Sequence, residues 1–323
     1  MSYEILAIVV PVFILIGLGY GVARTGLLSQ AVGEALGQYV YVIAIPVLIF
    51  RTLAVLELGD ESPWGLWISY FIGVAVTWGL ANLIIRKGFG RDARAGVVGG
   101  ISAAFANTVM VGLPLVSSIY GEDGLVPLLI IISVHMPVMT VVISILMERA
   151  AAVDGISTPP PIGEMVLKIG RNLATNPIII AIACALIWRS FSLPVSGILQ
   201  NVLDRIAATA LPVALLSLGM SMVIYGIRGN ILPGLQLSCL KIAIMPTIVF
   251  LAGAYLFHLP PLWTAVATVT AACPTGINAY IFANRYGTGH AMSANSITLT
   301  TLAAVLTSGI WVAILTYWQS AGL

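Results

Sequence analysis

Cys273-Pro274-Thr275-Gly276-Ile277-Asn278 lies in the middle of a long apolar run and decides how the chain can fold. Proline, glycine and asparagine so close together interrupt a helix. Interrupted backbone at membrane depth survives only where it lines a cavity or is buried in protein. A second such stretch, Asn107 to Pro114, lies in the first half of the chain. Two interrupted spans in corresponding halves indicate the binding site of a transporter.

The composition excludes a soluble protein. Of the 323 residues, 59% are hydrophobic and only 8% are charged, whereas soluble domains carry about 25% charged residues. Apolar runs of about 20 residues, each long enough to cross a bilayer core of roughly 30 Å, recur along the chain. We therefore predict an all-α membrane protein whose surroundings are the lipid bilayer. A net charge of +2 without a basic tract gives no indication of nucleic-acid binding.

Ten membrane-spanning helices are predicted, five before and five after a polar connection. They are expected at residues 3–23, 32–54, 64–85, 94–119, 125–148, 176–191, 197–225, 232–257, 262–286 and 291–318. The first five make up residues 1–150, a cytoplasmic linker covers residues 151–175, and the last five make up residues 176–323.

The distribution of Lys and Arg predicts the orientation. Ten of these residues fall on the side opposite the N-terminus and three on the same side, with Lys241 inside a span. Because positively charged loops stay in the cytoplasm, both termini are predicted to be extracytoplasmic.

The two halves match each other when the chain is shifted by 166 positions. The matched pairs are Pro11 with Pro177, Ile45-Pro46-Val47 with Leu211-Pro212-Val213, and Tyr120-Gly121 with Tyr286-Gly287. In this register Asn107 to Gly112 lies over Cys273 to Asn278. Since each half has five spans, the second half must be inserted upside down. The pattern predicts two inverted five-helix repeats whose broken fourth and ninth helices cross.

The predicted crossing suits a small anion. Each break exposes the amino end of a half-helix, whose free N–H groups and dipole attract negative charge, and amide and hydroxyl side chains add further hydrogen-bonding groups. The alternative is that the prolines and glycines only kink the helices for packing. The predicted substrate-binding residues are Asn107, Thr108, Gly112, Pro114, Pro274, Thr275, Gly276 and Asn278.

Lys241 and His135 are two ionisable residues inside the predicted spans. A charge at this depth costs about 2.5 to 3.5 kcal/mol on insertion scales. Lys241 is expected either to be a charge partner of a carboxylate or of proton coupling, or to extend to the cytoplasmic surface. His135 is predicted to bind an acidic substrate or carry a coupling proton, with a buried neutral histidine as the alternative. No metal site is predicted, because His258 and His290 are expected at opposite membrane faces.

Two segments resemble the signature segments of the auxin efflux carrier family. They are Ala106 to Leu115 followed by Tyr120-Gly121, and Pro274 to Asn278 with Phe282, Ala283 and Tyr286. That family contains plant PIN exporters and bacterial carriers of malonate or malate. The resemblance implies a scaffold of spans 1, 2, 6 and 7, a moving transport domain of spans 3–5 and 8–10, a homodimer and elevator-like alternating access. The short linker, Cys273 and Asn278 are more similar to the bacterial members.

The leading hypothesis is a secondary active transporter of a small organic acid anion, similar to malonate or malate, in the bacterial inner membrane. The alternatives are an exporter of an auxin-like aromatic carboxylate and a membrane sensor that uses the same pocket. An enzyme is not expected, because no span offers a Ser-Lys pair, an Asp pair or a His-carboxylate cluster. No cofactor is expected, and the coupling ion, H⁺ or Na⁺, is left open.

Overall fold

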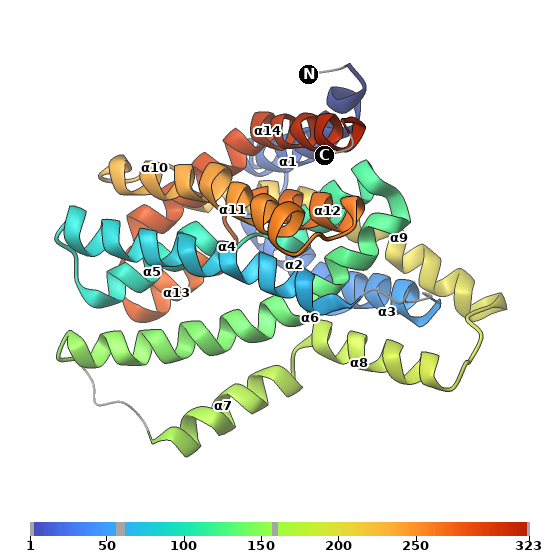
Figure 1. The fold of residues 1–323 in the computed structure, drawn as a ribbon, viewed down its shortest axis with the longest axis horizontal. Coiled ribbons are helices and arrows are strands. Elements are labelled where there is room, and N and C mark those ends of the chain that lie inside the picture. Colours follow the sequence, from blue (N-terminus) through green and yellow to red (C-terminus); the bar gives the residue numbers. More distant parts are fainter. Residues whose placement is uncertain (1–2, 56–61, 157–160, 322–323) are drawn as a thin grey trace.

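A computed structural model describes residues 3–55, 62–156 and 161–321 of the chain. Within these residues the secondary structure is helical, apart from one isolated β-bridge. Most helices run along the horizontal axis of Figure 1, and the linker helix lies at the lower edge of the view, below α6. The predicted all-α class is therefore confirmed for the described residues.

The helices follow the predicted spans closely. The first half contains α1 (Tyr3–Arg24), α2 (Gln30–Tyr39), η1 (Val40–Ala44), α3 (Ile45–Val55), α4 (Pro63–Leu83), η2 (Ile84–Gly88), α5 (Ala93–Ala104), η3 (Thr108–Gly112) and α6 (Leu113–Val153). The linker carries α7 (Ile162–Ala174), and its residues 157–160 lie outside the described residues. The second half contains α8 (Pro177–Ser190), α9 (Gly197–Tyr225), α10 (Ile231–Cys239), η4 (Leu240–Ile244), α11 (Met245–Leu251), η5 (Ala252–Leu256), α12 (Pro261–Ala272), α13 (Asn278–Tyr286) and α14 (His290–Ser320).

Seven helical segments of the described chain are long and apolar enough to cross a membrane. They are Ala7–Arg24, Gln30–Val55, Pro63–Gly88, Thr108–Val153, Gly197–Tyr225, Ile231–Leu256 and His290–Ser320. Pro177–Ser190 and Pro261–Ala272 are apolar but shorter. Within Thr108–Val153 the backbone bends at Gly121, whose φ of 63° and ψ of −152° only glycine adopts readily. The count of ten spans stays a prediction.

Prolines widen three of these helices without ending them. Pro46, Pro114 and Pro246 each stand two residues after a π-helical turn, namely η1, η3 and η4. A proline ring clashes with the carbonyl four residues earlier, and a wider turn relieves this clash. Pro114 therefore belongs to the start of α6 and lies outside the break itself.

Element boundaries recur between the two halves at a constant offset. Three helical elements of the first half have counterparts that begin 168 positions later: α4 at Pro63 and α10 at Ile231, η2 at Ile84 and η5 at Ala252, and α5 at Ala93 and α12 at Pro261. The bend at Gly121 is likewise followed 168 positions later by Gly289, and both residues have positive φ. The offset of 166 from the sequence is therefore two residues too short in this region, and Asn107 corresponds to Thr275.

The buried hydrophobic residues form two main clusters. One gathers side chains of α1, α3, α8, α9, α12 and α14 around η3 and the first half of α6. The other gathers side chains of α4, α5, α10 to α13 and the later part of α6. Glycines allow α1 and α9 to approach closely, because a Cβ at Gly19 would overlap the carbonyl of Leu216 and one at Gly219 that of Ile16.

Asp154 joins the end of α6 to the start of α5. Its carboxylate accepts the backbone N–H groups of Ala93 at 2.9 Å and Arg94 at 3.0 Å, and it pairs with Nε of Arg94 at 3.0 Å. Burial disfavours the charged carboxylate, but these hydrogen bonds outweigh it and lower the pKa of Asp154. The negative charge also stabilises the amino end of α5.

Replacing Asp154 by Asn is expected to lower the melting temperature of the detergent-solubilised protein at pH 7. Because the folded pKa is depressed, the stabilisation is complete above the unfolded pKa and is lost as the pH falls through the folded pKa. The deficit should therefore narrow only below about pH 4. Thermal unfolding followed by circular dichroism at several pH values measures this, with Asp123→Asn on the exposed α6 surface as the control. A deficit that is independent of pH down to pH 3 would contradict it.

Candidate functional site

The two helix breaks meet and satisfy each other's backbone. α5 ends at Ala104 and α12 ends at Ala272, and an antiparallel bridge joins Ala106 to Thr275. The N–H of Asn107 donates to the carbonyl of Pro274 at 2.9 Å, and the N–H of Gly276 donates to the carbonyl of Phe105 at 2.8 Å. Unpaired backbone groups are costly in an apolar interior, so this short pairing stabilises both interruptions.

Local sequence explains why each break takes this form. Pro274 disfavours helical conformation at Cys273, which has extended backbone with φ −55° and ψ 148°. In the first break the side-chain oxygen of Asn107 accepts the N–H of Met110 at 3.2 Å and thereby caps η3. Gly276 is required for close approach, because a Cβ there would lie 2.9 Å from the ring of Phe105.

A cavity of about 480 Å³ opens beside the crossing. Most of its lining comes from four groups of residues: Phe105 to Met110 from the first break, Gly276 to Asn278 from the second, one face of α2 and η1 between Gly33 and Tyr41, and the end of α9 between Ser217 and Tyr225. Ile45, Met136 and Ile281 complete it. The cavity therefore lies between the paired breaks and the two helices that pack against them.

Four of the predicted site residues line this cavity: Asn107, Thr108, Gly276 and Asn278. Pro274 and Thr275 lie in the crossing itself, where the hydroxyl of Thr275 donates to the carbonyl of Ser102 at 2.7 Å. Gly112 and Pro114 lie in η3 and at the start of α6 and do not line the cavity.

Both breaks leave unpaired backbone donors at residues that line this cavity. The backbone N–H groups of Val109, Ile277 and Asn278 form no hydrogen bond with any other described residue. All three residues line the cavity and stand at the amino ends of η3 and α13. Free N–H groups at the positive ends of helix dipoles favour negative charge.

The cavity would bind an anion through helix dipoles and not through a cationic side chain. Among the described residues that line it, none is Lys, Arg or His, and Glu34 of α2 is exposed. The amide groups of Asn107 and Asn278 and the hydroxyl of Thr108 are the polar side chains that the two breaks add to the cavity lining. A carboxylate would thus be bound by hydrogen bonds and helix dipoles in a largely apolar cavity, which includes Met110, Met136 and Phe105.

The end of α9 contributes residues that sequence reasoning missed. Ser217, Ser221 and Tyr225 line the cavity and share one helix face, because they are four residues apart. The hydroxyl of Ser217 donates to the carbonyl of Gly33 at 2.9 Å and so connects α9 to α2. The four-residue spacing of these polar side chains in an apolar span was the available signal.

A second pocket of about 320 Å³ adjoins the first at the end of the bundle where α7 lies. Tyr41, Phe105, Met136 and Asn278 line both pockets. The remaining lining includes the connection between α7 and α8, from Asn172 to Pro177. The second pocket thus lies between the crossing and the connection from α7 to α8.

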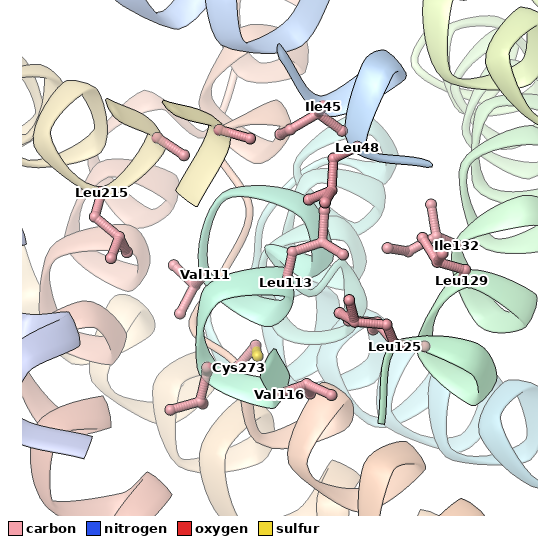
Figure 2. Close-up of a cluster of buried hydrophobic side chains, with 14 of the residues drawn as sticks. Ile45, Leu48, Val111, Leu113, Val116, Leu125, Leu129, Ile132, Leu215 and Cys273 are labelled. Carbon is pink, nitrogen blue, oxygen red and sulfur yellow. The ribbon is translucent and has the colours of Figure 1, made fainter. Parts of the chain in front are cut away.

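Buried apolar side chains pack on the other side of the cavity, along α3 and α6. Along α3, Ile45 lines the cavity, and Leu48 lies one turn further on, against Leu113 of α6 (Figure 2). We call Leu48, Leu113, Val116, Leu125 and Leu129, which Figure 2 shows gathered between α3 and the two parts of α6, the apolar seal.

Ion pairs lie beyond the apolar seal. Arg51, one turn after Leu48, pairs with Asp204 of α9 at 2.6 Å and with Glu122 at the α6 bend at 3.0 Å. The apolar seal and the ion pairs thus follow each other along α3, at Leu48 and Arg51.

His135 and Lys241 do not line the cavity. His135 is fully buried between the rings of Tyr70 and Phe105, with centroid distances of 5.5 and 4.9 Å, and its ring nitrogens have no hydrogen-bond partner in the described structure. Lys241 is also fully buried, and its ammonium donates to the carbonyl of Ala271. Neither residue therefore borders the cavity directly.

Comparison with known proteins agrees with this architecture. A family described as membrane transport protein matches residues 4–312 of the chain. A Rhizobium meliloti (strain 1021) protein named "Putative malonate transporter" is 28% identical over 317 residues, which cover 94% of this chain and 93% of that protein. A Methanothermobacter thermautotrophicus protein named "Uncharacterized transporter" is 24% identical over 311 residues, covering 95% and 97%.

The resemblance read from the two signature segments is thereby confirmed. The family and both relatives are named for transport and not for an enzymatic activity, as the sequence predicted. The chain is a multi-pass membrane transport protein, and it belongs to the membrane transport protein family that includes the auxin efflux carriers.

Proposed function

We propose that this protein is a secondary active transporter of a small organic acid anion, similar to malonate or malate, and that the anion binds at the crossing of the two helix breaks. The observation that carries this proposal is the convergence of free N–H groups from two helix amino ends, together with Asn107 and Asn278, on one cavity. The name of the Rhizobium meliloti relative supports a dicarboxylate of this size.

An inverted repeat explains why the two breaks come together. The constant offset of 168 between element boundaries supports two repeats, residues 1–150 and 176–323, joined by a cytoplasmic linker at 151–175. The packing pairs are also reciprocal, since α1 packs along α9 and α8 packs along α3. Ten spans, five in each repeat, would bring the second repeat into the membrane in the opposite direction.

The helix packing supports an elevator mechanism, because α1, α2, α3, α8 and α9 make their most extensive contacts with one another. We assign these five helices to a scaffold and the remaining membrane helices, α4 to α6 and α10 to α14, to a moving transport domain. The cavity lies where the breaks of the transport domain face α2 and α9 of the scaffold. Movement of the transport domain along this boundary would carry the anion across the membrane. A homodimer through the scaffold would hold that boundary in place.

Charge distribution supports an orientation with the α7 end in the cytoplasm and both termini outside, in the bacterial inner membrane. In this orientation the cavity opens toward the cytoplasm, and the apolar seal and the Arg51 ion pairs close the extracytoplasmic side. The Arg51–Asp204 pair joins α3 to α9 within the scaffold, and the Arg51–Glu122 pair joins the scaffold to the α6 bend of the transport domain. The Arg51–Glu122 pair would have to separate in each transport cycle.

Two other functions use the same cavity. The first is export of an aromatic carboxylate. The cavity volume lies within the range of about 300 to 1,000 Å³ that holds drug-sized ligands, and Phe, Tyr and Met side chains line the cavity. A membrane sensor would bind the same anion without moving it. Counterflow of labelled substrate separates a transporter from a sensor, since only a transporter exchanges substrate across the bilayer.

Replacing both Asn107 and Asn278 by Ala is expected to lower uptake of the best carboxylate substrate by at least about tenfold, because both lost amides bind the carboxylate. Uptake of a labelled panel of mono- and dicarboxylates into proteoliposomes measures this. Asn284→Ala is the matched control, because Asn284 lies on α13 with its side chain exposed. Uptake by the double variant within twofold of the wild type would exclude the crossing as the binding site.

Replacing Arg51 by Gln is expected to loosen the extracytoplasmic closure, because both ion pairs of Arg51 are lost. The measurement is the rate at which a membrane-impermeant maleimide labels Leu125→Cys in the apolar seal. We expect this rate to rise severalfold in the Arg51→Gln background. Arg205→Gln, which removes an exposed neighbouring charge, should leave it unchanged. Equal labelling rates of Leu125→Cys in the wild-type and Arg51→Gln backgrounds would show that the Arg51 pairs do not hold the closure.

A further inference from the structure

Lys241 is a fully buried lysine at the point where α10 passes into η4. Its ammonium donates to the carbonyl of Ala271 and lies 3.4 Å from Sδ of Met245. Among the described residues, no Asp or Glu lies within ion-pair distance of it. The partner of this charge is therefore a helix end and not a carboxylate.

Ala271 is the second-last residue of α12, so its carbonyl is one of those that a helix end leaves without an intrahelical partner. The N–H of Cys273 donates to the carbonyls of Val269 and Thr270, which leaves that of Ala271 for Lys241. A cation is favoured here because the carboxyl end of a helix dipole is negative. In transporters with broken helices, such carbonyl ends are where coupling ions bind.

Stability does not explain a lysine at this position. Burying an ammonium costs several kcal/mol, about the scale measured for buried ions, and methionine fills nearly the same space without that cost. The charge of Lys241 also lies close to the crossing. Ala271 is three residues before Pro274, whose carbonyl pairs with Asn107 across the crossing. Lys241 thus adds positive potential behind a cavity whose described lining contains no cationic side chain.

We propose that the Lys241 ammonium is a built-in cation at the carboxyl end of α12, in the place where a sodium-coupled carrier would bind its ion. Transport of the carboxylate by this protein then requires no sodium. Lys241 is a positioning residue, because it acts on the anion through α12 and the crossing without touching the cavity. This inference rests on the proposed function and names its coupling requirement.

The first test replaces sodium by choline on both sides of proteoliposomes that contain the wild-type protein. Uptake of the best carboxylate is expected to stay within twofold of its value in sodium. Uptake that falls tenfold or more in choline would overturn the inference while leaving the proposed function intact. A wild-type protein that shows no carboxylate uptake in either buffer would overturn the proposed function and this inference with it.

The second test is Lys241→Met, with Lys87→Met on the exposed end of η2 as the matched control. Uptake by Lys241→Met is expected to fall at least tenfold, whereas its melting temperature should equal or exceed that of the wild type, since no charge is buried. Uptake within twofold of the wild type would overturn the inference. A fall in uptake accompanied by a clear fall in melting temperature would mark Lys241 as structural and would also overturn it.

Discussion

The structure depends on the backbone pairing of two interrupted helices. At membrane depth neither break could persist alone, because its N–H and carbonyl groups would lack partners. Two hydrogen bonds, from Asn107 to Pro274 and from Gly276 to Phe105, satisfy each break with the other. This requirement explains why interruptions so far apart in the sequence meet in space. It also makes each half of the chain depend on the other for its fold.

The pairing divides the polar groups of the crossing between two sides. On the cavity side, the amino ends of η3 and α13 keep free N–H groups that can bind an anion. At the carboxyl end of α12, the carbonyl of Ala271 has no partner within its own helix and accepts a hydrogen bond from Lys241. The same break thus supplies a site for negative charge and a site for positive charge. In our proposals the substrate takes the first and the lysine takes the second.

Much of the fold could be predicted from the sequence, because apolar length and the signals of Pro and Gly are local. Asn107 and Asn278 were predicted at the crossing for this reason, and both line the cavity. The first break was harder to locate. Pro114 indicated it, but this proline widens a helix, and the chain leaves the helix at Phe105, where pairing with the second break decides the backbone. The four-residue spacing of Ser217, Ser221 and Tyr225 indicates a shared polar face of α9, but that this face meets the crossing depends on how α9 packs.

The most direct test of the central claim is a structure of the protein with its best-transported carboxylate carrying a bromine or selenium label. Anomalous or difference density locates the label without assuming a site. Our account predicts density in the cavity, with a carboxylate within hydrogen-bond reach of the N–H groups of Ile277 and Asn278. Density confined to the pocket beside α7, or on the Lys241 side of the crossing, would contradict it.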